Sequence, residues 1–130
     1  MRLMLPLLAI LATPAGACAL PQRFALAQVA QGPVVVVANV TAYRLNGGEG
    51  LLMLDVSEVW KGIAPDHLTA RWQVKLAEPP PATWDRSRAV IAALSPTGQG
   101  FDLVVEICGS AWLVPDTPET RSIIRAALSR

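Results

Sequence analysis

The stretch VVVVANVTAY at residues 34–43 decides the fold, because its apolar side chains recur at every second position. The even-numbered positions are apolar throughout, whereas the odd-numbered positions become polar after Val37. Side chains of a β-strand point alternately to opposite faces. The pattern therefore predicts a strand with one buried face and one face that becomes solvated along its length.

The following segment is predicted to pair with this strand across a flexible turn at residues 46–50, which contain three glycines. Residues 51–60 alternate again, but the alternation breaks before Trp60. A β-bulge near Ser57 or Glu58 would restore the last apolar residues to useful directions. We therefore expect a long hairpin.

Three further strands follow, separated by segments rich in proline and glycine. Residues 68–76 alternate apolar and polar side chains, which is typical of a strand buried on one side. The proline-rich residues 77–86 predict an exposed loop. Residues 89–94 are the fourth predicted strand, residues 95–100 a turn, and residues 101–107 the fifth strand.

Helices are predicted on both sides of the strand region. Residues 20–32 favour a short helix or helical turn. Further along, Thr117 offers an N-cap hydroxyl and Pro118 suits the first turn of a helix. This second helix is predicted to turn Arg125 to solvent and to bury Ile123, Ile124, Ala127 and Leu128. Five antiparallel strands with a covering helix predict a mostly β fold, a small closed barrel.

The first 17 residues have the pattern of a secretory signal peptide. Arg2 precedes an apolar run at residues 3–12, and small residues lead to an A-x-A cleavage site that ends at Ala17. The run is shorter than the roughly 20 residues of a membrane-spanning helix. We therefore expect a signal peptide at residues 1–17 and a single exported domain at residues 18–130.

The chain has two cysteines, and the fate of the first depends on where the signal is cut. Cleavage after Ala17 leaves Cys18 at the amino terminus, where it could pair with Cys108 in an oxidising compartment. Cleavage after Ala19 removes Cys18, and a lipoprotein signal would acylate it and anchor the chain in a membrane. Only the first route leaves Cys108 a partner, which is part of the reason to prefer it. Such a bridge closes a loop of about ninety residues and is worth roughly 4–5 kcal/mol as an upper figure.

The exported domain carries no net charge. The sequence has 11 basic and 10 acidic residues, and Arg2 leaves with the signal peptide. A neutral chain has no general attraction to nucleic acid or anionic lipid, so we expect no nucleic-acid partner.

The order of these parts resembles the tissue inhibitor of metalloproteinases, or netrin-like, domain in the form of a small exported bacterial protein. The resemblance rests on Cys18 at the start of the mature chain, the strand end VWKG at residues 59–62 and the late motif ICGS at residues 107–110. It spans nearly the whole mature chain. It implies an OB-type five-stranded barrel with a short helix before it and a helix after it.

The departures from that family concern its inhibitory edge. Animal inhibitors begin Cys-x-Cys and grip the protease zinc with their terminal amine and carbonyl, whereas this chain reads Cys18-Ala19-Leu20. Residues 81–85 hold no cysteine where the family has another bridge. Metalloprotease inhibition through the Cys18 amine is therefore an alternative function, as is a membrane-anchored lipoprotein.

No group of residues in the sequence has the pattern of a catalytic or metal site. The single histidine, His67, follows Asp66 in a predicted surface turn, whereas zinc needs three or four converging ligands. The sequence contains no C-x-x-C, G-x-S-x-G or S-x-x-K motif. Solvated strand faces account for the carboxylates Glu58, Asp66, Asp102 and Glu106. We therefore expect a protein that is not an enzyme and holds no cofactor.

Four tryptophans stand out in a chain that is poor in other aromatic residues. Trp72 is in phase with the buried face of its strand, while Trp60 and Trp112 end strands, where core and rim are both compatible. Trp84 follows three prolines in the exposed loop. A stiff loop of this kind can present an aromatic anchor to a partner, and packing back onto the barrel is the alternative.

The predicted binding surface lies on the second and third strands, across which OB-type barrels generally bind. On this ground Arg71, Gln73 and Trp84 are candidate partner contacts. The sequence thus predicts an exported non-catalytic domain, periplasmic in a Gram-negative bacterium or secreted, that binds an unknown protein partner in the cell envelope.

Overall fold

The computed structural model describes residues 26–73, 77–78, 88–105, 109–110 and 112–130. The elements in chain order are η1 (Leu26–Gln31), β1 (Val34–Asn46), β2 (Glu49–Lys61), β3 (His67–Gln73), β4 (Ala77–Glu78), β5 (Arg88–Thr97), β6 (Gly100–Leu103), β7 (Gly109–Ser110), β8 (Leu113–Pro115) and α1 (Pro118–Leu128). The predicted signal peptide, Cys18, Trp84 and Cys108 lie outside the described residues.

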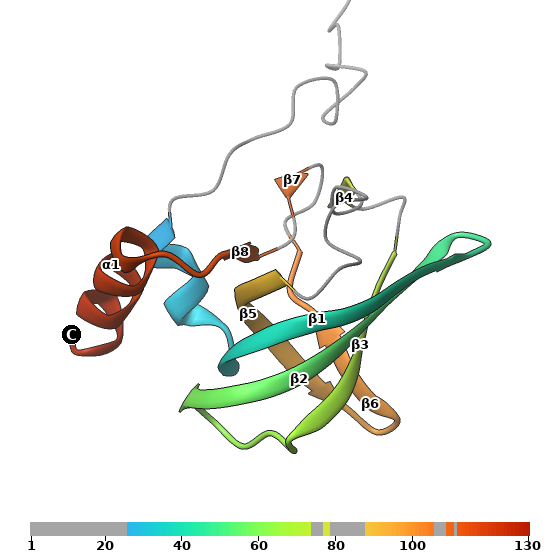
Figure 1. Ribbon diagram of the computed structural model, residues 1–130, viewed down its shortest axis with the longest axis horizontal. Coiled ribbons are helices and arrows are strands. Elements are labelled where there is room, and N and C mark those ends of the chain that lie inside the picture. The colour runs from blue at the N-terminus through green and yellow to red at the C-terminus, as the bar shows by residue number, and fades with distance from the viewer. Residues whose placement is uncertain (1–25, 74–76, 79–87, 106–108, 111) are drawn as a thin grey trace, which may run out of the picture.

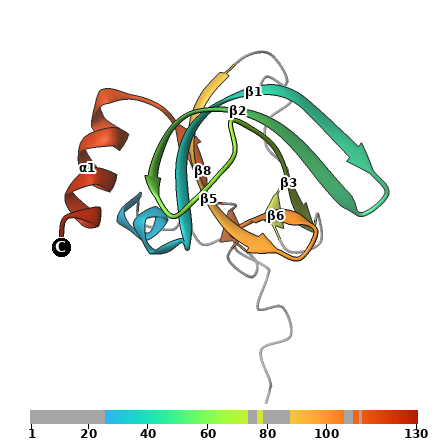
Figure 2. The same cartoon turned by 90° about the horizontal axis from the view of Figure 1, so that it is seen from below.

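Five strands close into a barrel in the order β1-β2-β3-β6-β5, because β1 is hydrogen-bonded to both β2 and β5 (Figure 2). The predicted mostly β fold, a five-stranded OB-like closed barrel with a short helix before it and a helix after it, is confirmed. The expectation that all five strands are antiparallel is wrong, since β3 and β6 run parallel. A ring with an odd number of strands cannot alternate direction throughout, so its closure requires a parallel pair.

The core has two parts, which share the wall formed by β1 and β5. One part fills the barrel and includes the even-numbered residues at the start of β1. The other lies between the outer face of this wall and the two helices, which sit together on one side of the barrel (Figure 1). The valine run of β1 is therefore buried on both faces. Its odd-numbered face becomes exposed at Asn39, as the sequence predicts.

The long hairpin of β1 and β2 is bent by irregularities in its register. The neighbouring residues Val37 and Ala38 pair with residues of β2 that are two apart, which leaves Ser57 unpaired. This is the predicted bulge, and the Ser57 hydroxyl donates a hydrogen bond to the Val37 carbonyl over 3.1 Å. Two further shifts leave Thr41 and Trp60 unpaired. Bulges strengthen the twist of a strand pair, which allows both strands to follow the barrel wall.

Several predicted strand boundaries are wrong. The turn predicted at residues 95–100 is shorter, because β5 continues to Thr97 and β6 begins at Gly100. The proline of that segment sits within the hairpin near its tip, where a strand tolerates the loss of an N–H donor. The strand predicted at residues 101–107 is also shorter, since β6 ends at Leu103. Part of the loop predicted at residues 77–86 is the short strand β4, which pairs with β7.

Helix α1 begins as the sequence predicts. The Thr117 side chain accepts a hydrogen bond from the Thr120 backbone, and the Thr120 hydroxyl accepts one from the Thr117 backbone, which forms a capping box. Ile124 is fully buried against the barrel wall. Ile123, which was predicted to be buried, is 36% exposed.

Candidate functional site

The outer face of β2 and β3 is the first candidate surface, because both described helices lie on another side of the barrel (Figures 1 and 2). The two strands pair antiparallel, so that Leu51 lies opposite Arg71 and Met53 opposite Thr69. Leu51 and Met53 are partly buried, whereas Thr69 is exposed. The face thus combines apolar surface with polar groups. We call this surface the open face. It consists of these four residues and the neighbouring carboxylates Glu49, Asp55 and Asp102.

Arg71, a predicted partner contact, lies at the centre of the open face. Its Nε is 3.7 Å from Glu49 Oε1 on β2 and 3.8 Å from Asp102 Oδ1 on β6. Both distances exceed the hydrogen-bond range, so these are loose surface ion pairs that add little stability. Among the described residues, these two carboxylates approach the guanidinium without forming a hydrogen bond with it.

The other two predicted contacts are described only in part. The backbone of Gln73 pairs with that of Glu49, two residues along β3 from Arg71. Trp84 lies outside the described residues, and so does Glu106 of the predicted carboxylate group. The structure thus brings Arg71 and the Gln73 backbone to neighbouring positions on β3, and the place of Trp84 stays a prediction.

His67 is exposed as expected, but its setting differs from the prediction. It begins β3 instead of lying in a turn, and its Nδ1 is 2.6 Å from Asp55 Oδ1 on β2. The sequence alone does not indicate Asp55, because only the pairing of β2 with β3 brings its carboxylate beside His67. Within the described part of the chain, no three His, Cys, Asp or Glu residues come together as a metal site would need.

A second candidate surface lies around Trp60, at the end of β2. Both arginines of α1 lie over its indole ring, with the guanidinium carbon of Arg121 at 5.5 Å and that of Arg125 at 4.7 Å from the ring centre. Trp60 packs at the rim of the core between barrel and helices. The sequence left core and rim open for this residue, and the structure places it at the rim.

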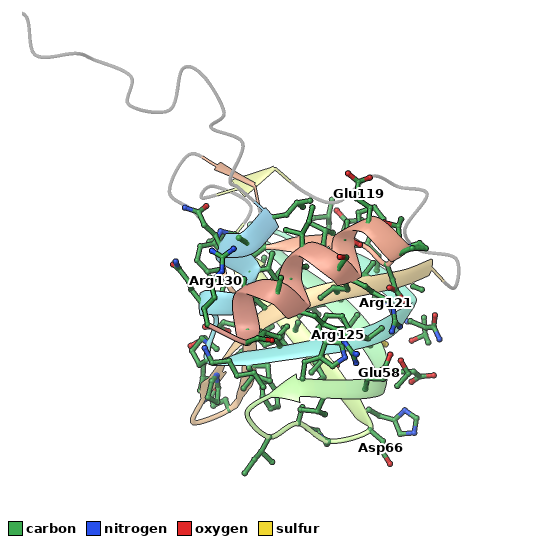
Figure 3. All side chains as sticks on the ribbon, turned by 90° about the vertical axis from the view of Figure 1, so that its left-hand side faces the viewer. Glu58, Asp66, Glu119, Arg121, Arg125 and Arg130 are labelled. Atoms are coloured by element: carbon green, nitrogen blue, oxygen red, sulfur yellow. The ribbon has the colours of Figure 1, made fainter. Side chains whose placement is uncertain are left out.

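The two arginines differ in how fully they are engaged. Arg121 donates to Asp116 over 2.6 and 3.0 Å. It also donates to Glu58 over 2.7 Å, and Figure 3 shows these two side chains facing each other between α1 and β2. The hydrogen bond from Arg121 holds the pKa of Glu58 below its ordinary value of 4.5, against a smaller opposing effect of desolvation. Asp116 and then Glu58 raise the pKa of Arg121. In the described part of the chain, the carboxylate oxygen that approaches Arg125 is Glu58 Oε1, at 3.7 Å from Nη2.

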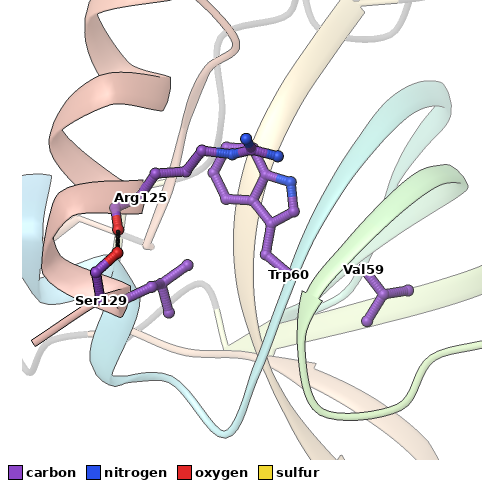
Figure 4. Close-up of a pocket in the computed structure, with 5 residues that line it drawn as sticks. Val59, Trp60, Arg125 and Ser129 are labelled. Carbon is purple, nitrogen blue, oxygen red and sulfur yellow. Dashed lines mark hydrogen bonds between the residues drawn. The ribbon is translucent and has the colours of Figure 1, made fainter.

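Beside Arg125 lies a pocket of about 410 Å³ that opens at the surface (Figure 4). It is lined by Val59, Trp60, Arg125, Leu128 and Ser129. This site is not evident from the sequence, because helix periodicity places Arg125 on the solvent side. A signal was present in the four-residue spacing of Arg121 and Arg125, which puts both side chains over one turn of the helix surface.

The four carboxylates singled out in the sequence do not share a site where the structure describes them. Glu58 binds Arg121 on α1, whereas Asp102 approaches Arg71 on the open face. Asp66 is exposed in the connection between β2 and β3. The sequence-based interpretation places all four on solvated strand faces. Asp102 is exposed on β6, whereas Glu58 is bound to α1 and Asp66 lies outside the strands.

Neither a scan against protein-family models nor a search of curated proteins finds a match to this chain. Among the described residues, no helix has the length and apolar character needed to cross a membrane. Cys18 and Cys108 fall outside the described residues. Their pairing, the netrin-like resemblance, acylation and inhibition through Cys18 therefore stay predictions.

Proposed function

We propose that this protein is an exported, non-catalytic domain that binds a protein partner in the cell envelope through its open face. The observation that carries the proposal is the arrangement around Arg71. This guanidinium lies beside the partly buried Leu51, between two carboxylates that approach it without hydrogen-bonding it. Arginine next to apolar area is a composition favoured at protein interfaces.

The place of Arg71 in the fold also supports binding through the open face. OB-type barrels generally bind their ligands across the second and third strands and the adjoining loops. Glu49 lies at the start of β2, beside the β1–β2 turn, and Asp102 lies near the β5–β6 turn. Arg71 thus sits between the two loops that such a barrel uses for recognition.

The charge of the open face argues against nucleic acid as the partner. The three described carboxylates Glu49, Asp55 and Asp102 outnumber the two arginines on either side of Leu51, which are Arg71 on β3 and Arg44 on β1. A phosphate backbone is bound by clustered basic side chains, which this face does not present. A folded or extended polypeptide is the ligand that suits a mixed face of this kind.

The experiment is site-specific photo-crosslinking in the cells that produce the protein. A crosslinker at Thr69, which is exposed on the open face, is compared with one at Ser122, which is exposed on α1. We expect a discrete adduct in the envelope fraction from position 69 only, and its loss in the Arg71→Glu variant. Equal adducts from both positions would exclude the open face as the binding surface, and a chain retained in the cytosol would exclude export.

A further inference from the structure

We propose that the pocket between the end of β2 and the last turn of α1 binds a carboxylate that carries an apolar side chain, as found at the carboxyl terminus of a partner polypeptide. This pocket is lined by Trp60 and Arg125 and shares no residue with the open face. The inference therefore goes beyond the proposed function.

Arg125 has N–H groups that no described carboxylate engages. Arg121 has carboxylate oxygens within 3.0 Å of its Nε and Nη2, whereas Arg125 has none within hydrogen-bond distance among the described residues. The side chain of Arg125 is also 59% exposed, so a ligand from solvent can reach it. Arginine is the residue best shaped for a carboxylate, which it binds with two parallel N–H groups.

Arg125 is held in position before a ligand binds. Its guanidinium lies over the Trp60 ring, with Cζ 4.7 Å from the ring centre (Figure 4). Stacking occupies the face of the guanidinium and leaves the N–H groups at its edge available. The Ser129 hydroxyl donates a hydrogen bond to the Arg125 carbonyl over 3.0 Å, which ties down the backbone at the end of the helix. Less entropy is lost on binding when the recognising group is held in place beforehand.

Apolar side chains line the pocket next to the Arg125 guanidinium. Val59, Leu128 and the Trp60 ring are the apolar part of the lining, and Val59 is 42% exposed. The volume of about 410 Å³ lies near the lower end of the roughly 300–1,000 Å³ of small-ligand sites. A space of this size accepts one branched aliphatic side chain while its carboxylate meets Arg125.

The openness of the pocket favours a polypeptide terminus over a free acid. Small ligands usually bury roughly 70–90% of their surface, which a rim formed by the half-exposed Val59 and Arg125 does not allow. The end of a polypeptide inserts only its last residue and gains further contacts outside the pocket. The chemistry of the site therefore fits a chain end better than an isolated molecule.

The electrostatics predict that Glu58 competes with the ligand. Arg121 keeps this carboxylate ionised, and its Oε1 stays 3.7 Å from Arg125 Nη2. A neutral side chain at position 58 should therefore strengthen carboxylate binding. The carbonyls at the end of α1 oppose an anion as well, so the affinity is set by the guanidinium and the apolar lining together.

The test is an NMR titration of the exported chain, as purified from its producing cells, with three probes. These are N-acetyl-Ala-Ala-Leu with a free carboxylate, the same peptide amidated, and octanoate. We expect the free acid to shift the indole resonance of Trp60 and the amides of Leu128 and Ser129. Amidation should weaken binding about tenfold or more, since a charge-assisted hydrogen bond contributes roughly 1.5–3 kcal/mol.

Three variants sharpen the outcome. Arg125→Gln should abolish binding of the free acid, Glu58→Gln should strengthen it several-fold, and Arg44→Gln, an exposed arginine on the β1–β2 hairpin, should leave it unchanged. The proposal is overturned if the amide binds as well as the acid, if Arg125→Gln retains binding, or if Glu58→Gln does not improve it. Binding of octanoate alone, or of no probe, overturns the assignment to a polypeptide terminus.

Discussion

Gly62 occupies a position at the end of β2 that has no room for a side chain. A Cβ atom there would lie 2.7 Å from the Pro33 carbonyl oxygen and 2.9 Å from Val34 Cγ2. Its φ of 75° is also one that residues other than glycine rarely adopt. The close approach of the chain after β2 to the start of β1 thus depends on this one glycine, which in the sequence is only the last residue of the VWKG motif.

We expect Gly62→Ala to lower the free energy of unfolding by about 2–3 kcal/mol, because steric overlap adds to the cost of the backbone conformation. Urea denaturation measures the difference. Gly48→Ala is the matched control, since a Cβ there meets nothing within 4 Å. A loss that is equal in both variants would mean that the close approach at Gly62 contributes nothing.

At the scale of elements, the sequence predicts what is periodic and local. The alternation of residues 51–60 indicates the bulge at Ser57, and the residues before α1 indicate its N-cap. The contact of Arg125 with Trp60 joins α1 to β2, and its distance along the chain hides it from any local pattern. The placement of Arg71 on one face of β3 follows from local alternation and is predictable. Its contact with Asp102 is not, because it depends on the order of the strands in the barrel.

The docking of α1 offers a test with two adjacent isoleucines. Ile124 is fully buried between helix and barrel, whereas Ile123 is 36% exposed. We expect Ile124→Ala to lower the free energy of unfolding by about 2–4 kcal/mol and Ile123→Ala by less than about 1 kcal/mol. Chemical denaturation of both variants gives the comparison. Similar losses would show that the helix rotates and buries either residue.

At the scale of the whole molecule, the strands of the barrel can be identified from the sequence, whereas their order and relative direction cannot. Alternation indicates four of the five barrel strands, and residues 89–94 are apolar throughout, but neither pattern carries information on the relative direction of the strands. The parallel pairing of β3 and β6 follows from closing a ring of five strands. The boundaries of β5 and β6 differ from the prediction because a two-residue turn suffices where several proline and glycine residues suggest a longer one.

The predicted bridge between Cys18 and Cys108 belongs to this scale, because it would tie the start of the mature chain to residues near the end of the barrel. We expect a reductant to lower the melting temperature by several degrees, since a long-range bridge restricts the unfolded chain. Differential scanning calorimetry with and without reductant measures this. Equal melting temperatures, or mass spectrometry that finds a mature chain starting at Leu20, would exclude the bridge.

The wall shared by the two parts of the core has a consequence for how the chain completes its folding. Its outer side is apolar at Val35, Val37 and Ile91, and the cover over it includes Ile124 from the end of the sequence. Because a polypeptide is synthesised from its amino terminus, this wall stays uncovered until α1 has been made. Truncation before α1 should therefore leave a barrel with an exposed apolar wall. We expect this barrel to aggregate unless a chaperone binds it, and not to form a smaller stable domain.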